Sequence, residues 1–284
     1  MSAKVMRGFV ERISQVMGGT CPHHCHDPSP IAVAKFSGGV PSTDYAFEMI
    51  CSTIRFGKGV TAEVGYDVRQ LGSKHTLIVT DKNVVNTKAF ESVSRSLQTL
   101  GMKFTVYDDV LIEPTDESML KAVAYARNAG CDSFVAVGGG SVIDTTKAAA
   151  LYCSNPEADF YDYVCPPFGQ NLVPKNPMLP LIAVPTTAGT GSETTGAAIM
   201  DLPKHECKSG IRQRCIKPIL AIVDPDNIKS MPRNVAIYSG FDVLCHALES
   251  YTALPYNKRV PRPSRPDLRP LYQGSNPISD VWSL

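Results

Sequence analysis

Short apolar runs alternate with segments of helical character along most of this chain, and that alternation limits the possible folds more than any other feature. The segments that follow the first three runs have helical patterns, reaching to about Leu100, spanning residues 116–129 and starting at Ser141. Short apolar strands separated by helices predict βαβ units with a parallel sheet covered on both faces. We therefore expect an α/β fold class. The apolar runs are TLIVTD (76–81), KFTVYDDV (103–110), SFVAV (133–137), LIAV (181–184) and ILAIV (219–223).

The sequence pattern changes near Met231 and Pro232. Beyond this point it is helical, with an interruption at residues 254–274 that is rich in Pro and Arg and therefore cannot be helix. We expect residues 45–232 to form the α/β domain and residues 233–284 to begin a helical domain. Close to the end, NPISDVWSL carries a helix-start pattern with Asn276 as N-cap, Pro277 and Asp280. Because the chain ends eight residues after that cap, we expect a truncated product.

Charge and composition exclude several classes of protein. Lys and Arg total 28 and Asp and Glu total 27, so the net charge of +1 gives no electrostatic reason to expect nucleic acid or an acidic membrane as a partner. No stretch approaches the roughly 20 continuous apolar residues that span a bilayer. The nine scattered cysteines are typical of reduced thiols. A soluble enzyme acting on small metabolites fits these properties best.

The first 20 or so residues have the pattern of a basic amphipathic helix, with Lys4, Arg7 and Arg12 against Glu11 alone. Such a helix is typical of a mitochondrial presequence, although an ordinary surface helix would give the same pattern. The dense group of Cys and His that follows, CPHHCHDPSP, could catch a metal, but no second cluster lies nearby in the sequence, and a linker is favoured. We expect residues 1–44 to be presequence and linker and the protein to be located in the mitochondrial matrix.

The first chemical motif is FVAVGGGSVIDTTK (134–147), in which a strand ends, three glycines turn the chain and a helix opens at Ser141. Glycine lets backbone N–H groups approach a phosphate, and a helix N-terminus adds about half a positive charge. The motif predicts a pyrophosphate cradle at Gly138, Gly139, Gly140 and Ser141. It is not the GxGxxG fingerprint, and a plain tight turn into a helix remains the alternative.

Asp81, at the end of the strand TLIVTD, is a second candidate. A carboxylate at the carboxyl edge of a parallel strand can accept hydrogen bonds from ribose hydroxyls and repel a 2′-phosphate, which favours NAD over NADP. The alternative is that Asp81 only caps the next helix.

A third motif, AVPTTAGTGSETT (183–195), forms a hydroxyl-rich loop after a buried strand. In open α/β sheets ligands bind at this edge, and such donors suit phosphate or a nicotinamide carboxamide. A plain polar turn is the alternative. The residues concerned are Thr186, Thr187, Gly189, Thr190, Gly191 and Ser192.

The fourth motif is SGFDVLCHALESY (239–251), where Asp242 and His246 are four residues apart and so share one helical face. A carboxylate and an imidazole suit a divalent ion such as Zn²⁺ or Fe²⁺. The alternative is a solvated pair that stabilises the helix by about 0.2–0.5 kcal/mol.

Taken together and in this order, the four segments resemble the iron-containing (group III) alcohol dehydrogenase family, and the resemblance runs from about Tyr45 to the C-terminus. It implies a dinucleotide-binding α/β domain followed by the start of an all-helical metal-binding domain, the arrangement shared with dehydroquinate synthase. It also implies NAD(H) and a divalent metal, Fe²⁺ or Zn²⁺, as cofactors. The residues it assigns are Asp81 to the adenosine ribose, Gly138, Gly139, Gly140 and Ser141 to pyrophosphate with Asp144 nearby, Thr186, Thr187 and Thr190 to the phosphate and nicotinamide side, Lys208 to the cofactor ribose, and Asp242 and His246 to the metal.

By the chemistry of the family, the metal polarises a hydroxyl or carbonyl group and a hydride passes to or from nicotinamide. The stretch TDYAFEMICSTIRFGKGVTAEVG, together with NPISDVW, is similar to a mitochondrial branch of the family that moves hydride from a hydroxy acid to an oxo acid. Small hydroxy-acid and oxo-acid substrates are expected, without nucleic acid or membrane, and a homo-oligomer is compatible with the sequence.

The family supplies two further histidine ligands downstream, and none of the six histidines here lies beyond His246. We therefore expect weak NAD binding and little turnover from this chain. An inactive nucleotide-binding remnant or splice product is one alternative. A lyase like dehydroquinate synthase, which shares the fold and cofactor, is another.

Overall fold

The computed structural model describes residues 51–253. The predictions for the presequence, for the Cys- and His-rich linker and for residues 254–284 lie outside the described residues. No described helix is long and apolar enough to cross a membrane.

A six-stranded parallel sheet forms the centre of the described chain, with strand order β1-β8-β5-β4-β2-β3. The α/β class is therefore confirmed, and all five predicted strands are present with ends shifted by at most three residues. The sixth, β1, was not singled out from the sequence. The strands are β1 (Thr53–Phe56), β2 (Thr76–Val79), β3 (Phe104–Tyr107), β4 (Ser133–Gly138), β5 (Leu181–Pro185) and β8 (Leu220–Val223).

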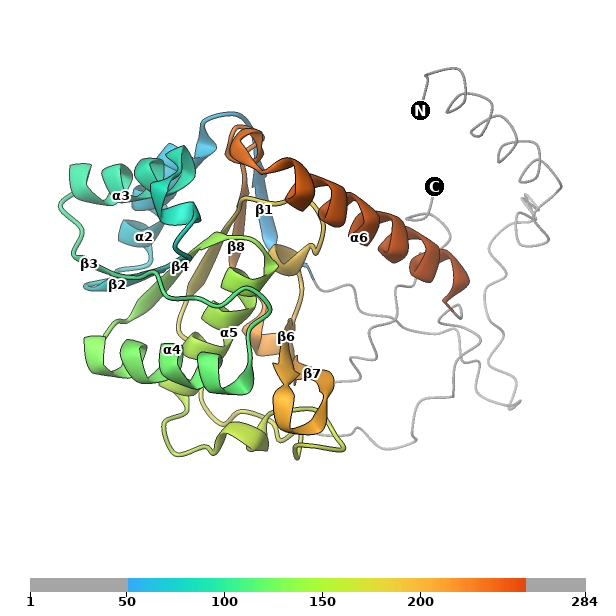
Figure 1. Cartoon of the computed structure of the whole chain (residues 1–284). Coiled ribbons are helices and arrows are strands. Elements are labelled where there is room, and N and C mark those ends of the chain that lie inside the picture. Colours follow the sequence, from blue (N-terminus) through green and yellow to red (C-terminus); the bar gives the residue numbers. More distant parts are fainter. Residues whose placement is uncertain (1–50, 254–284) are drawn as a thin grey trace, which may run out of the picture. The chain divides into compact units, whose positions relative to one another are not determined.

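Helices cover both faces of the sheet, as its buried strands require (Figure 1). On one face α2 (Val64–Gln70) and α3 (Lys88–Thr99) pack against alternate residues such as Ile78 and Val135. On the other face α4 (Asp116–Ala129) and α5 (Gly140–Ser154) pack against the intervening residues, including Leu77. Because strand side chains alternate between faces, residues 76–79 and 133–138 are apolar almost throughout.

The chain reverses direction across the sheet between β2 and β4. From β2 it moves outward to β3, and it then crosses back so that β4, β5 and β8 lie on the other side of β2. The loops that follow β2 and β4 therefore leave the sheet in opposite directions and open a crevice at their carboxyl ends, where open α/β sheets bind ligands. Asp81 follows β2 and Gly138 ends β4, so both lie at this switch point.

An antiparallel hairpin, β6 (Ala197–Leu202) and β7 (Cys207–Arg212), was not expected from the sequence. Residues of β6 alternate between buried and more exposed positions, and its buried residues Ala198, Met200 and Leu202 pack into a second core beside α4 and α5. The hairpin brings Lys208 to the edge of the domain.

The last described helix, α6 (Arg233–Thr252), agrees with the helical pattern predicted beyond Pro232. It has no buried residue, and its apolar side chains, such as Phe241 and Leu248, are exposed. The division of the chain at residue 232 into two domains stays a prediction.

Candidate functional site

A cavity of about 350 Å³ lies beside the loops that follow β4 and β5. Five segments contribute to it: the loop after β3, the start of α5, residues 190–195, the β6–β7 hairpin and α6. Its volume is within the range of small-molecule sites. Eight of the residues singled out from the sequence line it: Gly140, Ser141, Asp144, Thr190, Ser192, Lys208, Asp242 and His246.

The glycine loop after β4 leaves no room for side chains. A Cβ on Gly140 would lie 2.7 Å from Thr190 Cγ2, and one on Gly139 would lie 3.1 Å from Thr187 Cγ2. The loops after β4 and β5 therefore pack directly against each other. No side chain caps the N-terminus of α5, whose N-cap is Gly139. An uncapped N-terminus of a 15-residue helix beside a cavity has the chemistry to accept an anion.

Asp81 lies at the same sheet edge but does not line the cavity. Its Oδ1 accepts hydrogen bonds from the backbone N–H groups of Asn83 (2.8 Å) and Val84 (3.0 Å). Asp81 therefore does cap the turn that follows β2, the alternative role considered above. The neighbouring Thr80 hydroxyl donates to the Val137 carbonyl (2.9 Å), which joins this turn to the glycine loop. Ribose binding by Asp81 stays a prediction.

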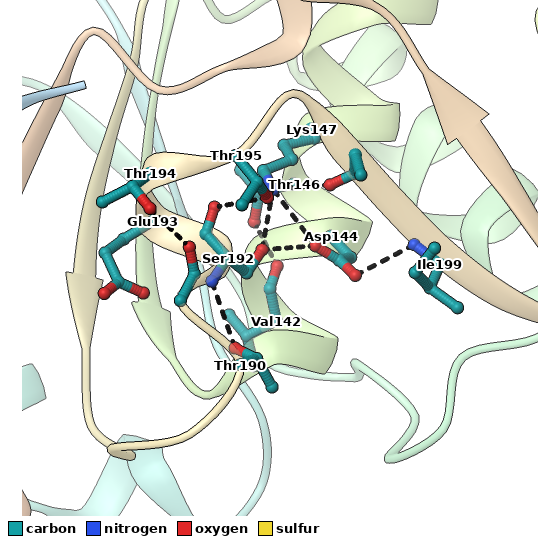
Figure 2. A network of polar contacts seen from close by, with 12 residues as sticks. Val142, Asp144, Thr146, Lys147, Thr190, Ser192, Glu193, Thr194, Thr195 and Ile199 are labelled. Atoms are coloured by element: carbon teal, nitrogen blue, oxygen red, sulfur yellow. Dashed lines mark hydrogen bonds and ion pairs between the residues drawn. The ribbon is translucent and has the colours of Figure 1, made fainter. Parts of the chain in front are cut away.

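Behind the cavity wall lies a buried network centred on Lys147, a side chain with no exposed surface (Figure 2). Its ammonium donates to Ser192 Oγ (2.7 Å), Thr195 Oγ1 (3.2 Å) and the Ala197 carbonyl (2.6 Å), and it pairs with Asp144 Oδ1 at 3.3 Å. Asp144 also accepts from the Ser192 hydroxyl and, through Oδ2, from the backbone of Ile199 (2.9 Å). Burial lowers the pKa of Lys147, and the charge of Asp144 opposes that effect.

Both carboxylate oxygens of Asp144 therefore already accept hydrogen bonds from protein donors. Asp144 lines the cavity, and its nearness to a pyrophosphate stays a prediction. Its contacts nevertheless tie α5 to the loop after β5 and to β6.

Lys208, on β7, lies at the rim of the cavity between two carboxylates. Its ammonium hydrogen-bonds Glu113 and lies 3.0 Å from Asp201 Oδ1, and the bond with Glu113 raises the pKa of the lysine. Glu113 has a left-handed backbone (φ 56°), and its N–H donates to Ser141 Oγ (3.3 Å). The loop after β3 is thus held over the start of α5.

Asp242 and His246 both face the cavity from α6, with His246 Nε2 3.8 Å from Asp242 Oδ1. The two side chains are 38% and 54% exposed, so the pair is open to solvent and to a ligand. A carboxylate oxygen and an imidazole nitrogen are a donor set that suits a borderline divalent ion. Within residues 51–253 no group of three or more His, Cys, Asp or Glu side chains could hold a metal, so the described part of the chain offers two ligands.

Sequence reasoning missed Lys147, Glu113 and Asp201 as residues of the site. Lys147 did carry a signal, because it stands three residues after Asp144 and just before the apolar run AAALY, where a lysine needs a buried partner. Glu113 and Asp201 carried no such signal in the sequence, because their pairing with Lys208 depends on the hairpin that was not predicted.

The fold and the cavity together define an open α/β protein with an uncapped helix N-terminus and a carboxylate–imidazole pair at the carboxyl edge of its sheet. The sequence model of the iron-containing alcohol dehydrogenase family matches residues 51–225. This chain belongs to the iron-containing alcohol dehydrogenase family.

Within this family, the chain is similar in sequence to curated proteins that share one name. The mitochondrial hydroxyacid-oxoacid transhydrogenase of Caenorhabditis briggsae is 68% identical over 283 residues, covering 100% of this chain and 60% of the relative. The human protein of the same name is 50% identical with the same coverage. The chain thus spans about 60% of the length of these curated relatives.

Solved structures agree with the family. An alcohol dehydrogenase from Oenococcus oeni superposes with a TM-score of 0.67 at 30% identity, covering 74% of this chain and 54% of that one. The sulfoacetaldehyde reductase of Bifidobacterium kashiwanohense, solved in complex with NAD⁺, gives a TM-score of 0.64 at 32% identity over 72% and 53% of the two chains.

Proposed function

We propose that this chain binds NAD(H) at the carboxyl edge of its sheet and supplies two ligands, Asp242 and His246, to a divalent metal. The reaction it serves is hydride transfer between a hydroxy acid and an oxo acid. One observation carries the proposal: the cavity gathers the start of α5, the loop after β5, Lys208 and the Asp242–His246 pair from segments far apart in the sequence.

The dinucleotide is proposed to span the switch point of the sheet. Asp81 would accept from the adenosine ribose with its remaining oxygen, and the N–H groups at Gly139, Gly140 and Ser141 would hold the pyrophosphate. The opposing loop would present Thr186, Thr187 and Thr190 to the phosphate and nicotinamide side, with Gly138 keeping the turn open. Lys208, once released by Glu113 and Asp201, would reach the nearby ribose.

At the reacting end, Asp242 and His246 are proposed to hold the metal against the nicotinamide side of the cavity. When bound, the metal, Fe²⁺ or Zn²⁺, would polarise the substrate oxygen, and the nicotinamide would carry the hydride. The role of this chain is to fix both groups on two elements that meet at one cavity.

The substrate class comes from the relatives. At 50–68% identity to proteins named hydroxyacid-oxoacid transhydrogenase, the chain is proposed to serve oxidation of 4-hydroxybutyrate to succinate semialdehyde. The paired reduction is that of 2-oxoglutarate to 2-hydroxyglutarate, without release of the cofactor. The relatives are named as mitochondrial, and the same location, in the matrix, is proposed here. The family match favours this reaction over that of a lyase like dehydroquinate synthase.

A titration of the purified chain with NADH, followed by cofactor fluorescence into the millimolar range, tests the binding part of the proposal. Saturable binding is expected, tighter for NADH than for NADPH. Absence of saturation would refute the proposed binding of NAD(H).

Turnover of 4-hydroxybutyrate with 2-oxoglutarate, measured with added Fe²⁺ or Zn²⁺, tests the catalytic part of the proposal. We expect rates well below those of a full-length relative, because the described residues provide only two metal ligands. Binding without any turnover would favour a nucleotide-binding role alone.

A further inference from the structure

Lys147 is the one lysine among the described residues with no exposed side-chain surface, and it has four acceptors around its ammonium. Three of these acceptors come from residues 192–197, about 50 positions further along the chain. The fourth, Asp144, is one turn away on α5. A long side chain reaching out of one helix to gather a distant segment does more than neutralise a neighbouring carboxylate.

The acceptor set matches a protonated amine. An ammonium has three N–H donors, and here it is surrounded by two hydroxyls, one carbonyl and one carboxylate. Asp144 supplies the opposite charge that a buried cation requires. Because its ammonium is engaged on all sides, Lys147 is not available to the reacting groups as a base.

A chain of contacts leads from Lys147 to the cavity. Ser192, which accepts from Lys147, also donates its backbone N–H to Thr190 Oγ1 (3.2 Å). With its oxygen accepting from Ser192, Thr190 can turn its own proton toward a ligand. Thr190 in turn packs where a Cβ on Gly140 would lie. The position of Lys147 thus fixes the distance between the loop after β5 and the start of α5.

We propose that Lys147 is a positioning residue that holds segment 190–197 against α5 in the geometry that binds the pyrophosphate and nicotinamide half of the dinucleotide. The ligand part of this inference rests on the proposed function, whereas the ordering of the segment does not. Asp81 and the adenosine side lie at the turn after β2, which makes none of these contacts. Lys147 therefore acts on one half of the ligand only.

Three variants of the 284-residue chain test this. Lys147→Met removes the ammonium but leaves Asp144 buried without its counter-charge. It is therefore compared with the double variant Lys147→Met/Asp144→Asn, which removes both charges and keeps a side-chain oxygen that accepts from the Ile199 N–H. Ser192→Ala removes one partner from the other side without burying a charge. Lys121→Met, at an exposed position on α4, is the matched control.

Hydrogen exchange of the ligand-free variants is the first measurement. We expect exchange in segment 190–197 to rise by about tenfold or more in the double variant and by less in Ser192→Ala, with the β5 amides and the Lys121→Met chain unchanged. Unchanged exchange in segment 190–197 would overturn the inference, whether or not the chain binds any dinucleotide.

The second measurement compares NADH with AMP, which carries only the adenosine half. The folded double variant should bind NADH about tenfold more weakly while its AMP affinity stays within about twofold of that of the unmodified chain. Equal losses for both ligands would assign Lys147 a general structural role and overturn its selective one. If the unmodified chain bound neither ligand, the proposed function would fail and the exchange result alone would decide the role of Lys147.

Discussion

A single methyl group at Gly140 is enough to separate the two loops that form the proposed anion site. The added Cβ would lie 2.7 Å from Thr190 Cγ2, closer than two carbon atoms can approach. The backbone of Gly140 is not in the left-handed region, so alanine is excluded there by space and not by conformation. The same substitution at Gly240 meets no atom within 4 Å.

Gly140→Ala is therefore expected to weaken NADH binding by at least about tenfold, since a displaced loop loses one or two charge-assisted hydrogen bonds to phosphate. Gly240→Ala should leave the affinity within about twofold. Isothermal titration of both variants gives the comparison. Equal affinities for the two would show that the dinucleotide does not use the junction between these loops.

At the scale of single residues, the sequence predicted which residues meet at the cavity better than it predicted the contacts that each one makes. Gly140, Thr190, Asp242 and His246 meet at one cavity because each belongs to a motif whose spacing already implies its place. Asp81 shows the limit, because a carboxylate after a strand caps a turn as readily as it binds a ribose. Lys208 shows a second limit. Its ion pair with Asp201 forms across a hairpin that no local pattern predicted, and its ion pair with Glu113 joins that hairpin to the loop after β3.

Among the elements, α4 was predicted with the bounds that it has in the structure, Asp116–Ala129, because its end signals are local. Thr115 and Ser118 form a reciprocal cap at its start, and Gly130 closes it in the left-handed conformation. The strands β6 and β7 were missed for the opposite reason. Only β6 alternates between buried and more exposed positions, and Pro203 follows it directly. The hairpin packs against α5, a contact that no local pattern predicts.

The contact of α6 with the loop after β5 depends on Gly189. A Cβ there would lie 3.0–3.1 Å from the Cβ, Cα and carbonyl oxygen of Ser239. Gly189→Ala should therefore push α6, and with it Asp242 and His246, away from the dinucleotide loop by a few tenths of an ångström.

We expect Gly189→Ala to reduce the coupling between Zn²⁺ and NADH binding, measured as the change in one affinity when the other ligand is present, while each ligand alone binds nearly as before. Gly240→Ala, on the same helix but facing open space, is the control. If both variants kept the full coupling, the approach of α6 to this loop would not matter for the site.

On the scale of the whole molecule, Asp224, directly after β8, holds Thr61, which lies near the start of the described residues. Its Oδ2 accepts from the N–H (3.2 Å) and the hydroxyl (2.9 Å) of Thr61, and its Oδ1 accepts from the Asp226 N–H (3.0 Å). Burial alone would raise the pKa of Asp224, but these hydrogen bonds outweigh it, and the pKa is lowered below the ordinary aspartate value.

A carboxyl group whose pKa is lower in the folded state stabilises the fold above its unfolded pKa of about 4, and that contribution is lost as the pH falls through the folded value. Asp224→Asn should lower the free energy of unfolding at pH 7 by about 1–3 kcal/mol and flatten its fall below pH 4. Urea unfolding between pH 2.5 and 7 measures this. The control is Asp109→Asn, because the side chain of Asp109 is 71% exposed. This substitution should change the free energy of unfolding by less than about 0.5 kcal/mol. A pH profile of Asp224→Asn that parallels the unmodified chain would contradict the assignment.

We propose above that one cavity places a metal on Asp242 and His246 beside the nicotinamide end of NAD. Mn²⁺, a paramagnetic substitute for the proposed metal, broadens the proton NMR signals of a ligand according to its distance from the ion. With the 284-residue chain, NAD⁺ and Mn²⁺, the nicotinamide protons should broaden more than the adenine protons, and His246→Ala should abolish that difference. Stronger broadening at adenine, or a difference that survives His246→Ala, would contradict the claim.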